Sequence, residues 1–147
     1  MIDESSLTLI ARRTIRASAA RLFAAWTEPA QLMAWWGPRT DVVCAVAEVD
    51  LRVGGKYRIG NRFPNGDMIW IAGEYEHIEP PHKLVFTWYV EADSAMVERV
   101  TVKLEPLNEM TEVIVIHERI INATVRDQHQ QGWFGCFNGL AGYLENN

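Results

Sequence analysis

The alternation of apolar and polar residues predicts a strand near the start of the chain and two short helices directly after it. Apolar and polar side chains alternate over residues 7–16, a spacing typical of a strand with one buried face. Ser18 can cap a following helix over residues 19–27, because its hydroxyl accepts a hydrogen bond from a free backbone N–H. Pro29 suits the first turn of a second short helix over residues 30–36.

The spacing then becomes that of strands for the middle of the chain. The expected strands cover residues 42–50, 56–62, 67–77, 83–91, 96–105 and 111–120. Turn signals separate them, among them Pro64-Asn65-Gly66 and Pro80-Pro81. Since the connections are too short for crossover helices, we expect these strands to form an antiparallel sheet with the first one.

The pattern of residues 124–144, the last long segment, predicts one amphipathic helix. Either Asn122 or Thr124 can cap its start. Its apolar stripe consists of Trp133, Phe137, Leu140 and Leu144, with His129 and Cys136 beside it. The helix also contains four glycines, each of which costs about 1 kcal/mol relative to alanine. We therefore expect it to be held by packing against the sheet, in one α+β domain over residues 1–147 with seven antiparallel strands. A helix packed across a curved sheet leaves space for a ligand cavity.

Composition narrows the range of partners. The chain of 147 residues carries a net charge of −5 and has no basic cluster, which argues against a nucleic-acid partner. No apolar run is long enough for a membrane span, and residues 1–8 do not resemble a signal peptide. Cys44 and Cys136 lack a paired spacing and are interpreted as reduced core residues, so a cytoplasmic location is expected.

Several segments resemble the START-like helix-grip superfamily, and within it the family named after the activator of heat-shock-protein-90 ATPase. The matching segments are RTIRA at 13–17, the helix around 23–26, WWGP at 35–38, DLRVGGKY at 50–57, GEYEHIEPP at 73–81, LVFTW at 84–88, VTVKLEP at 100–106, and Gly132-Trp133 with Tyr143-Leu144. They cover nearly the whole chain in order. The resemblance implies a helix-grip fold, in which the curved sheet wraps around the long C-terminal helix. Since that superfamily includes ligand carriers, polyketide cyclases and co-chaperone domains, the fold alone does not select a function.

The last predicted hairpin contains a candidate polar cluster. If residues 107–110 form its loop, Val100 faces His117 and Glu98 faces Arg119 on the concave side of the sheet. Glu98, His117 and Arg119 could orient a ligand or act as acid–base groups at the end of an apolar cavity. The favoured interpretation is a buried histidine satisfied by a hydrogen bond beside a cross-strand ion pair.

The aromatic residues are the second candidate set. Those expected near the space between sheet and helix are Trp26, Tyr57, Tyr75, Phe86, Trp88, Trp133 and Phe137. They either line a hydrophobic pocket, with Tyr75 as a hydrogen-bonding group, or simply fill the core. Trp70 has the opposite strand parity to its neighbours, so we expect it to be exposed, which would suggest a homodimer face.

Catalytic, metal and cofactor motifs are not recognisable. His77, His82, His117 and His129 lack metal-ligand spacing, and no nucleophile elbow is present, so we expect no metal and no cofactor. The leading interpretation is binding of a small hydrophobic or amphipathic molecule in the cavity. The alternatives are a polyketide cyclase or dehydratase-like enzyme that uses His117 with Glu98 or Tyr75, and a chaperone-associated protein-interaction module.

Overall fold

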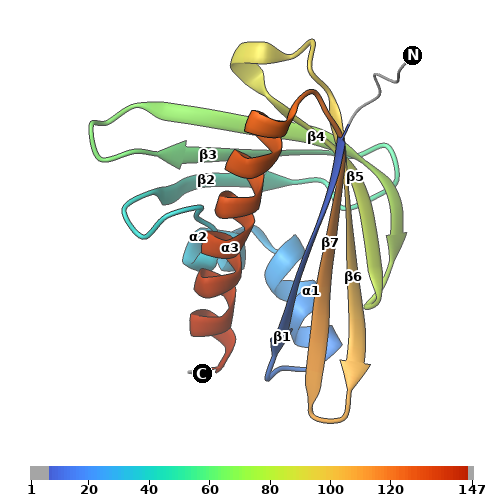
Figure 1. Cartoon of the computed structure of the whole chain (residues 1–147). Coiled ribbons are helices and arrows are strands. Elements are labelled where there is room, and N and C mark those ends of the chain that lie inside the picture. Colours follow the sequence, from blue (N-terminus) through green and yellow to red (C-terminus); the bar gives the residue numbers. More distant parts are fainter. Residues whose placement is uncertain (1–6, 146–147) are drawn as a thin grey trace.

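The computed structural model describes residues 7–145 and contains one strongly curved sheet with a long helix across it (Figure 1). The elements in chain order are β1 (Leu7–Ile15), α1 (Ala19–Thr27), α2 (Pro29–Trp35), β2 (Val43–Val49), β3 (Lys56–Arg62), β4 (Met68–Glu79), β5 (Lys83–Val90), the short 3-10 helix η1 (Glu91–Asp93), β6 (Glu98–Leu107), β7 (Met110–Ile120) and α3 (Ala123–Glu145). This order confirms the predicted α+β helix-grip architecture.

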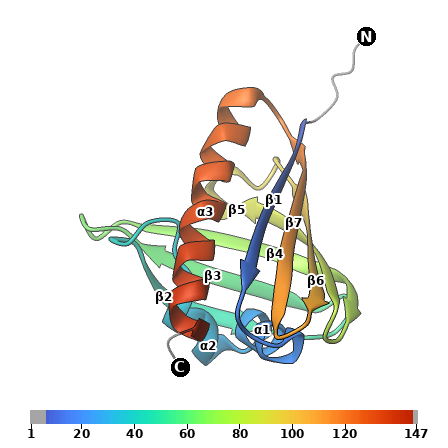
Figure 2. The same ribbon diagram turned by 60° about the horizontal axis from the view of Figure 1, so that its bottom comes forward.

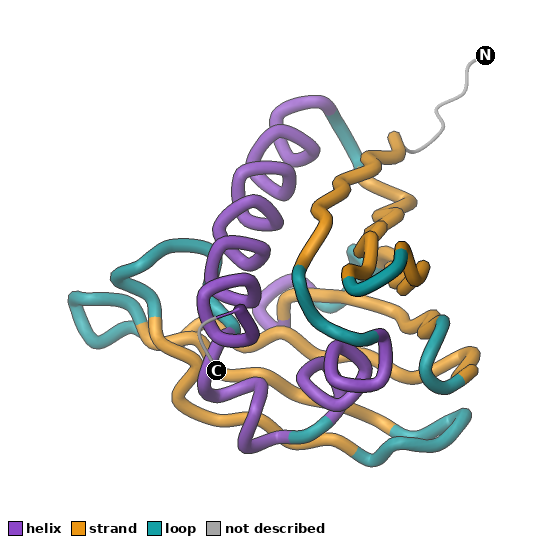
Figure 3. Tube along the Cα trace, turned by 90° about the horizontal axis from the view of Figure 1, so that it is seen from below, coloured by secondary structure: helices purple, strands orange, loops and turns teal. Residues whose placement is uncertain are grey.

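The seven strands form a single antiparallel sheet in the order β1-β7-β6-β5-β4-β3-β2. Strand β1 therefore pairs with the last strand, which brings the two ends of the chain's strand region together. The pairing register shifts between Tyr75 and His77 on β4, and such irregularities increase strand bending. The sheet curves around the helices, with α3 alongside β1 and the two short helices near its C-terminal end (Figures 2 and 3).

The helix starts follow from the residues that precede them. The Ser18 hydroxyl accepts a hydrogen bond from the backbone N–H of Arg21 at 3.1 Å, so it caps α1 as predicted. At α3, the Asn122 side chain accepts from the backbone N–H of Val125 at 2.9 Å. Asn122 is therefore the cap, one of the two residues that the sequence offered.

The apolar stripe of α3 is buried in the core. Trp133, Phe137, Leu140 and Leu144 are all at most 3 % exposed. The helix glycines let α3 approach the end of α2 and the loop after it. A Cβ atom on Gly135 would lie 1.9 Å from the backbone oxygen of Pro38, and one on Gly139 would lie 2.4 Å from that of Trp35. Close backbone packing thus compensates for the low helix propensity of glycine at these two positions.

Trp70 does not form an exposed apolar surface. Its ring is half-buried, and the guanidinium of Arg58 lies 3.6 Å from the ring centroid in a cation–π contact. Arg58 is itself held by Glu91 through two hydrogen bonds of 2.7 and 2.9 Å. The expectation of an exposed Trp70 is therefore wrong, and the homodimer stays a prediction without this support.

No helix among residues 7–145 combines the length and the hydropathy needed to traverse a bilayer.

Candidate functional site

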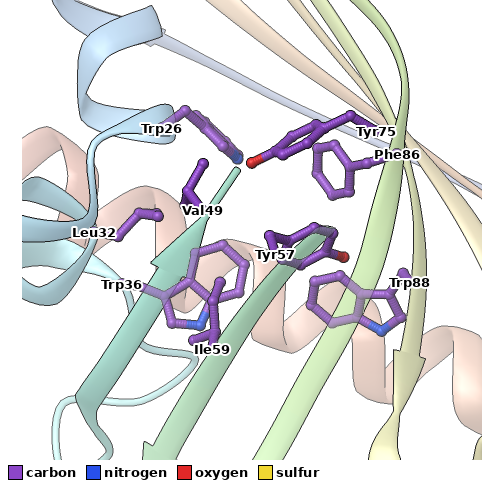
Figure 4. A pocket seen from close by; sticks show the side chains of 9 residues that line it. All are labelled: Trp26, Leu32, Trp36, Val49, Tyr57, Ile59, Tyr75, Phe86 and Trp88. Atoms are coloured by element: carbon purple, nitrogen blue, oxygen red, sulfur yellow. The ribbon is translucent and has the colours of Figure 1, made fainter. Parts of the chain in front are cut away.

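A small inner pocket lies between the short helices and the concave face of β2 to β5. Figure 4 shows the side chains that line it: Trp26, Leu32, Trp36, Val49, Tyr57, Ile59, Tyr75, Phe86 and Trp88. Its free volume is only about 20 Å³, which is room for about one water molecule. Rings fill most of this region: Tyr57 contacts both Tyr75 and Phe86, with ring centroids 5.6 and 5.3 Å apart.

The two inner tyrosines differ in how their hydroxyl groups are satisfied. The Tyr57 hydroxyl donates to the backbone oxygen of Thr87 at 2.7 Å, so it links β3 to β5 and is not free to bind a ligand. The Tyr75 hydroxyl makes no hydrogen bond to the described residues and points toward the indole nitrogen of Trp26 (Figure 4). Burial raises the pKa of Tyr75, so it remains a neutral phenol.

A larger cavity, the outer chamber, lies between α3, the loop after α2 and the concave face of the sheet. It is lined by Trp36, Pro38, Asn61, Ile71, Trp88, Val90, His117, Gln128, His129, Gly132, Trp133 and Cys136. Its volume is about 180 Å³. This exceeds the roughly 150 Å³ of an engineered apolar cavity that accepts benzene, so the outer chamber has space for a ring-sized molecule. Trp36 and Trp88 separate it from the inner pocket, with ring centroids 6.0 Å apart.

Three buried polar atoms around the outer chamber have no hydrogen-bond partner among the described residues. They are the indole nitrogens of Trp36 and Trp88 and the side-chain oxygen of Asn61. An unsatisfied buried polar group costs about 1–3 kcal/mol, and native proteins contain few. These are the only such atoms in the described part of the chain, and all three belong to residues that line this one cavity.

A chain of hydrogen bonds forms one wall of the outer chamber. The indole N–H of Trp133 donates to Nδ1 of His117 at 3.0 Å. Nε2 of His117 lies 2.6 Å from a carboxylate oxygen of Glu98, and Nε2 of His129 lies 2.9 Å from the same oxygen. The two imidazole rings are stacked, with centroids 4.6 Å apart. Helix α3 thus contributes His129 and Trp133, whereas β6 and β7 contribute Glu98 and His117.

The partners determine which ring nitrogens carry protons. An indole nitrogen only donates, so Nδ1 of His117 must accept and the proton of the neutral ring is on Nε2. That Nε2–H donates to Glu98. His129 also donates to this carboxylate through Nε2, which leaves the lone pair of its Nδ1 free in the neutral ring. No described residue binds that Nδ1.

Burial and hydrogen bonding set the charges of this cluster. Burial disfavours the charged form of Glu98, but the hydrogen bonds from His117 and His129 outweigh it and lower its pKa to about 2. Burial lowers the pKa of His117, and the hydrogen bond to Glu98 opposes this only in part. The cluster at neutral pH is therefore an ionised carboxylate with a neutral, buried His117.

The same three residues have donor atoms close enough to surround a cation. One ligand atom each from Glu98, His117 and His129 lies within 4.8 Å of the others. A cation on Nε2 of His117 would move the ring proton to Nδ1, where it would face the N–H of Trp133. This donor-to-donor conflict favours a proton-bearing cluster over a metal site.

The predicted site residues separate into three groups. Trp88, Glu98, His117 and Trp133 form or adjoin the outer chamber, whereas Trp26, Tyr57, Tyr75 and Phe86 line the inner pocket. Phe137 lies in the core next to Trp133, with ring centroids 6.3 Å apart. The predicted pairing of Val100 with His117 is confirmed.

Arg119 does not join the cluster, so that expectation is wrong. Its backbone adopts φ = 67°, a left-handed conformation that interrupts the alternation of faces along β7. Its side chain is exposed as a result. The place predicted for Arg119 beside Glu98 is taken by His129.

Three residues of the outer chamber, Trp36, Asn61 and His129, were not among the predicted site residues, although the sequence contains a signal for the last two. His129 precedes Trp133 by four residues, which puts both on one face of α3. Asn61 has the same strand parity as Tyr57 and Ile59, which predicts that its side chain points inward, and it is buried. Cys136 also lines the outer chamber, but burial raises its pKa to about 12 and makes it a poor nucleophile.

Comparisons with known proteins agree with this fold. A family model described as "Activator of Hsp90 ATPase homolog 1-like protein" matches residues 16–145. Among curated proteins, none matches the sequence.

Solved structures of the same shape are numerous. A protein from Chromobacterium violaceum is 27% identical with a TM-score of 0.84, over 95% of this chain and 98% of that one. An AHSA1-like protein from Aeromonas hydrophila is 20% identical with a TM-score of 0.77, over 95% and 93% of the two chains. A Plasmodium falciparum protein described as an HSP90 activator is 25% identical with a TM-score of 0.67, over 86% of each chain. Since the family model spans most of the sequence, the chain belongs to the family of Activator of Hsp90 ATPase homolog 1-like proteins.

Proposed function

We propose that this protein binds a small, neutral, amphipathic molecule in the outer chamber. The observation that carries the proposal is the clustering of three unpartnered buried polar atoms, on Trp36, Trp88 and Asn61, around one cavity of about 180 Å³. A bound molecule that hydrogen-bonds to these atoms would remove their desolvation cost.

The lining defines the chemistry of the ligand. The two indole N–H groups need acceptor atoms, which a carbonyl, ether or ring nitrogen provides. Most other lining side chains are apolar or aromatic, which favours a flat, ring-sized body. The ionised Glu98 next to the chamber disfavours an anionic ligand.

Substitution of Gly132 by leucine should block the outer chamber. A Cβ atom at Gly132 meets only Pro38, at an ordinary contact distance of 3.6 Å, so the backbone tolerates a side chain. A leucine there occupies the cavity that Gly132 lines, and we expect ligand affinity to fall by about tenfold or more. The measurement is quenching of tryptophan emission during titration with a neutral ring-sized probe that carries an acceptor oxygen, such as acetophenone, since three tryptophans line the chamber.

Gly142→Leu is the matched control. Gly142 lies in the same helix, is exposed, and has nothing within 4 Å of the place that a Cβ atom would take. Its substitution should leave affinity unchanged. Equal affinities in the two variants would count against the outer chamber as the binding site. Native mass spectrometry of the purified protein, compared with the denatured mass, would identify a retained natural ligand.

A protein partner is the second candidate function. It is favoured by the similarity to the Plasmodium falciparum HSP90 activator and by a surface groove between α3 and residues 33–44. Exposed Met33, Val43 and Phe134 line this groove and are 46, 47 and 49 % exposed. Apolar side chains gathered in this way are typical of protein-docking surfaces.

A single substitution separates the two candidates. If the groove docks HSP90, purified protein should stimulate HSP90 ATPase turnover, and Phe134→Asp should abolish the stimulation while probe binding in the outer chamber persists. Absence of any stimulation by the unmodified protein would remove this candidate.

A further inference from the structure

In the hydrogen-bond chain beside the outer chamber, each side chain is oriented by its neighbour, although ligand binding alone does not need this. Trp133 orients His117, His117 orients Glu98, and Glu98 orients His129. Each contact assigns a proton to a particular atom, and the ring nitrogen that keeps a free lone pair is Nδ1 of His129. A histidine oriented by a carboxylate in this way is the usual arrangement of a general base.

His129 is also where a ligand can reach it. Its side chain is 22 % exposed, whereas His117 is completely buried. His129 lines the outer chamber and also an adjoining surface groove that includes Asp93, Met96 and Val125. A proton accepted from a bound molecule could therefore pass from His129 to solvent along this groove.

Hydrogen-bond donors for a developing negative charge lie across the same chamber. The Trp88 ring centroid is 6.4 Å from that of His129, and Trp36 lies beside Trp88 (Figure 4). Both indole N–H groups are buried and unpartnered. Donors held in fixed positions stabilise a developing oxyanion more strongly than mobile water does, because they need no reorientation during the reaction.

From this geometry we infer that the outer chamber is an acid–base site, in which His129 removes a proton from a bound neutral molecule while Trp36 and Trp88 stabilise the oxygen that becomes negative. The inference rests on the proposed ligand binding in the same chamber. His129 is the catalytic residue because it would touch the substrate, and Glu98, His117 and Trp133 are positioning residues. The substrate class is a neutral, ring-sized carbon acid, and proton removal needs no cofactor or co-reactant.

The step can be tested with 5-nitrobenzisoxazole, a neutral and nearly flat probe of a buried base. Nδ1 of His129 would take the probe's C–H proton, and the C–H electron pair would form the third bond of a nitrile. The N–O bond breaks, and its electron pair remains on oxygen as a coloured phenolate that accepts hydrogen bonds from the indoles. Proton loss from His129 to solvent restores the protein, so the atoms and charges balance.

We expect the unmodified protein to convert the probe, with kcat/KM rising as pH increases through the deprotonation of one group. The ionisable side chains around His129 are Glu98 and His117 in the hydrogen-bond chain, with Asp93 and Tyr89 along the groove. His129→Gln should lower kcat/KM by about 10²-fold or more, the usual contribution of a general base, while the probe still quenches tryptophan emission. In His129→Ala, added imidazole should restore part of the turnover.

His82→Gln is the control for a histidine that lies exposed in the turn between β4 and β5. It should keep full turnover. Unchanged turnover in both His129 variants, or probe binding by the unmodified protein without conversion, would overturn the acid–base role and leave the binding proposal standing. If the unmodified protein neither binds nor converts the probe, or if Gly132→Leu alters neither quantity, the outer chamber is not the site and both proposals fail.

Discussion

Gly135→Ala should destabilise the protein strongly, although alanine is the better helix former. The added methyl group would lie 1.9 Å from the backbone oxygen of Pro38 and 2.5 Å from its carbonyl carbon. Backbone atoms cannot rotate away as a flexible side chain can, so α3 would have to separate from the loop that follows α2. We expect the free energy of unfolding to fall by about 3 kcal/mol, the upper range for overpacked positions, measured by urea denaturation.

Gly142→Ala provides the matched comparison in the same helix. No atom lies within 4 Å of a Cβ at this exposed position, so only helix propensity changes. The free energy of unfolding should rise by about 0.5–1 kcal/mol. Opposite signs for one chemical change would establish that α3 packs on the Pro38 backbone. A Gly135→Ala variant as stable as the unmodified protein would contradict this packing.

Acidification should remove a large part of the stability through Glu98. The pKa of Glu98 is about 2 in the folded protein, against 4.5 for an ordinary glutamate. Burial alone would raise this pKa, but the hydrogen bonds from His117 and His129 stabilise the carboxylate form and lower it. The unfolded chain therefore takes up the proton first as pH falls. The stabilisation is complete above about pH 5 and is lost toward pH 2. Since one pKa unit corresponds to about 1.4 kcal/mol, the effect is on the order of 3 kcal/mol.

Acidification should also lower the stability through His117, beginning at a higher pH than for Glu98. Burial lowers its pKa in the folded protein below the ordinary value of 6.5, so below that pH the unfolded chain binds a proton that the folded protein does not. Stability should therefore begin to fall as pH decreases below 6.5, before Glu98 contributes.

Variants separate the Glu98 contribution from general acid denaturation. The difference in unfolding free energy between the unmodified protein and Glu98→Gln should narrow steadily from about pH 5 to about pH 2, because glutamine cannot titrate. Glu105→Gln, an exposed residue on the same strand β6, should show no comparable narrowing. If the difference in unfolding free energy between the unmodified protein and Glu98→Gln stays constant with pH, the hydrogen bonds from His117 and His129 do not lower the pKa of Glu98.

Local patterns were sufficient for the order and type of the elements. Strands repeat every two residues and helices about every 3.6, so the apolar stripe of α3 and the faces of the strands are visible in the sequence. The register that pairs Val100 with His117 also follows locally, because a short loop determines which residues face each other. The resemblance in the turn and core segments then identified the helix-grip architecture that the structure has.

The composition of the site was decided only by tertiary structure. His129 reaches Glu98 because α3 crosses the sheet, and no local pattern specifies which turn of a helix meets which strand. The Arg119 side chain faces outward because the left-handed backbone of Arg119 itself interrupts the alternation of faces along β7. The amino-acid types in β7 do not predict this conformation. The space itself depends on how the Trp36 and Trp88 rings pack, since the same aromatic residues that fill the inner pocket leave the outer chamber open. Periodicity is a property of neighbouring residues, whereas cavities and hydrogen-bond chains arise from contacts between distant ones.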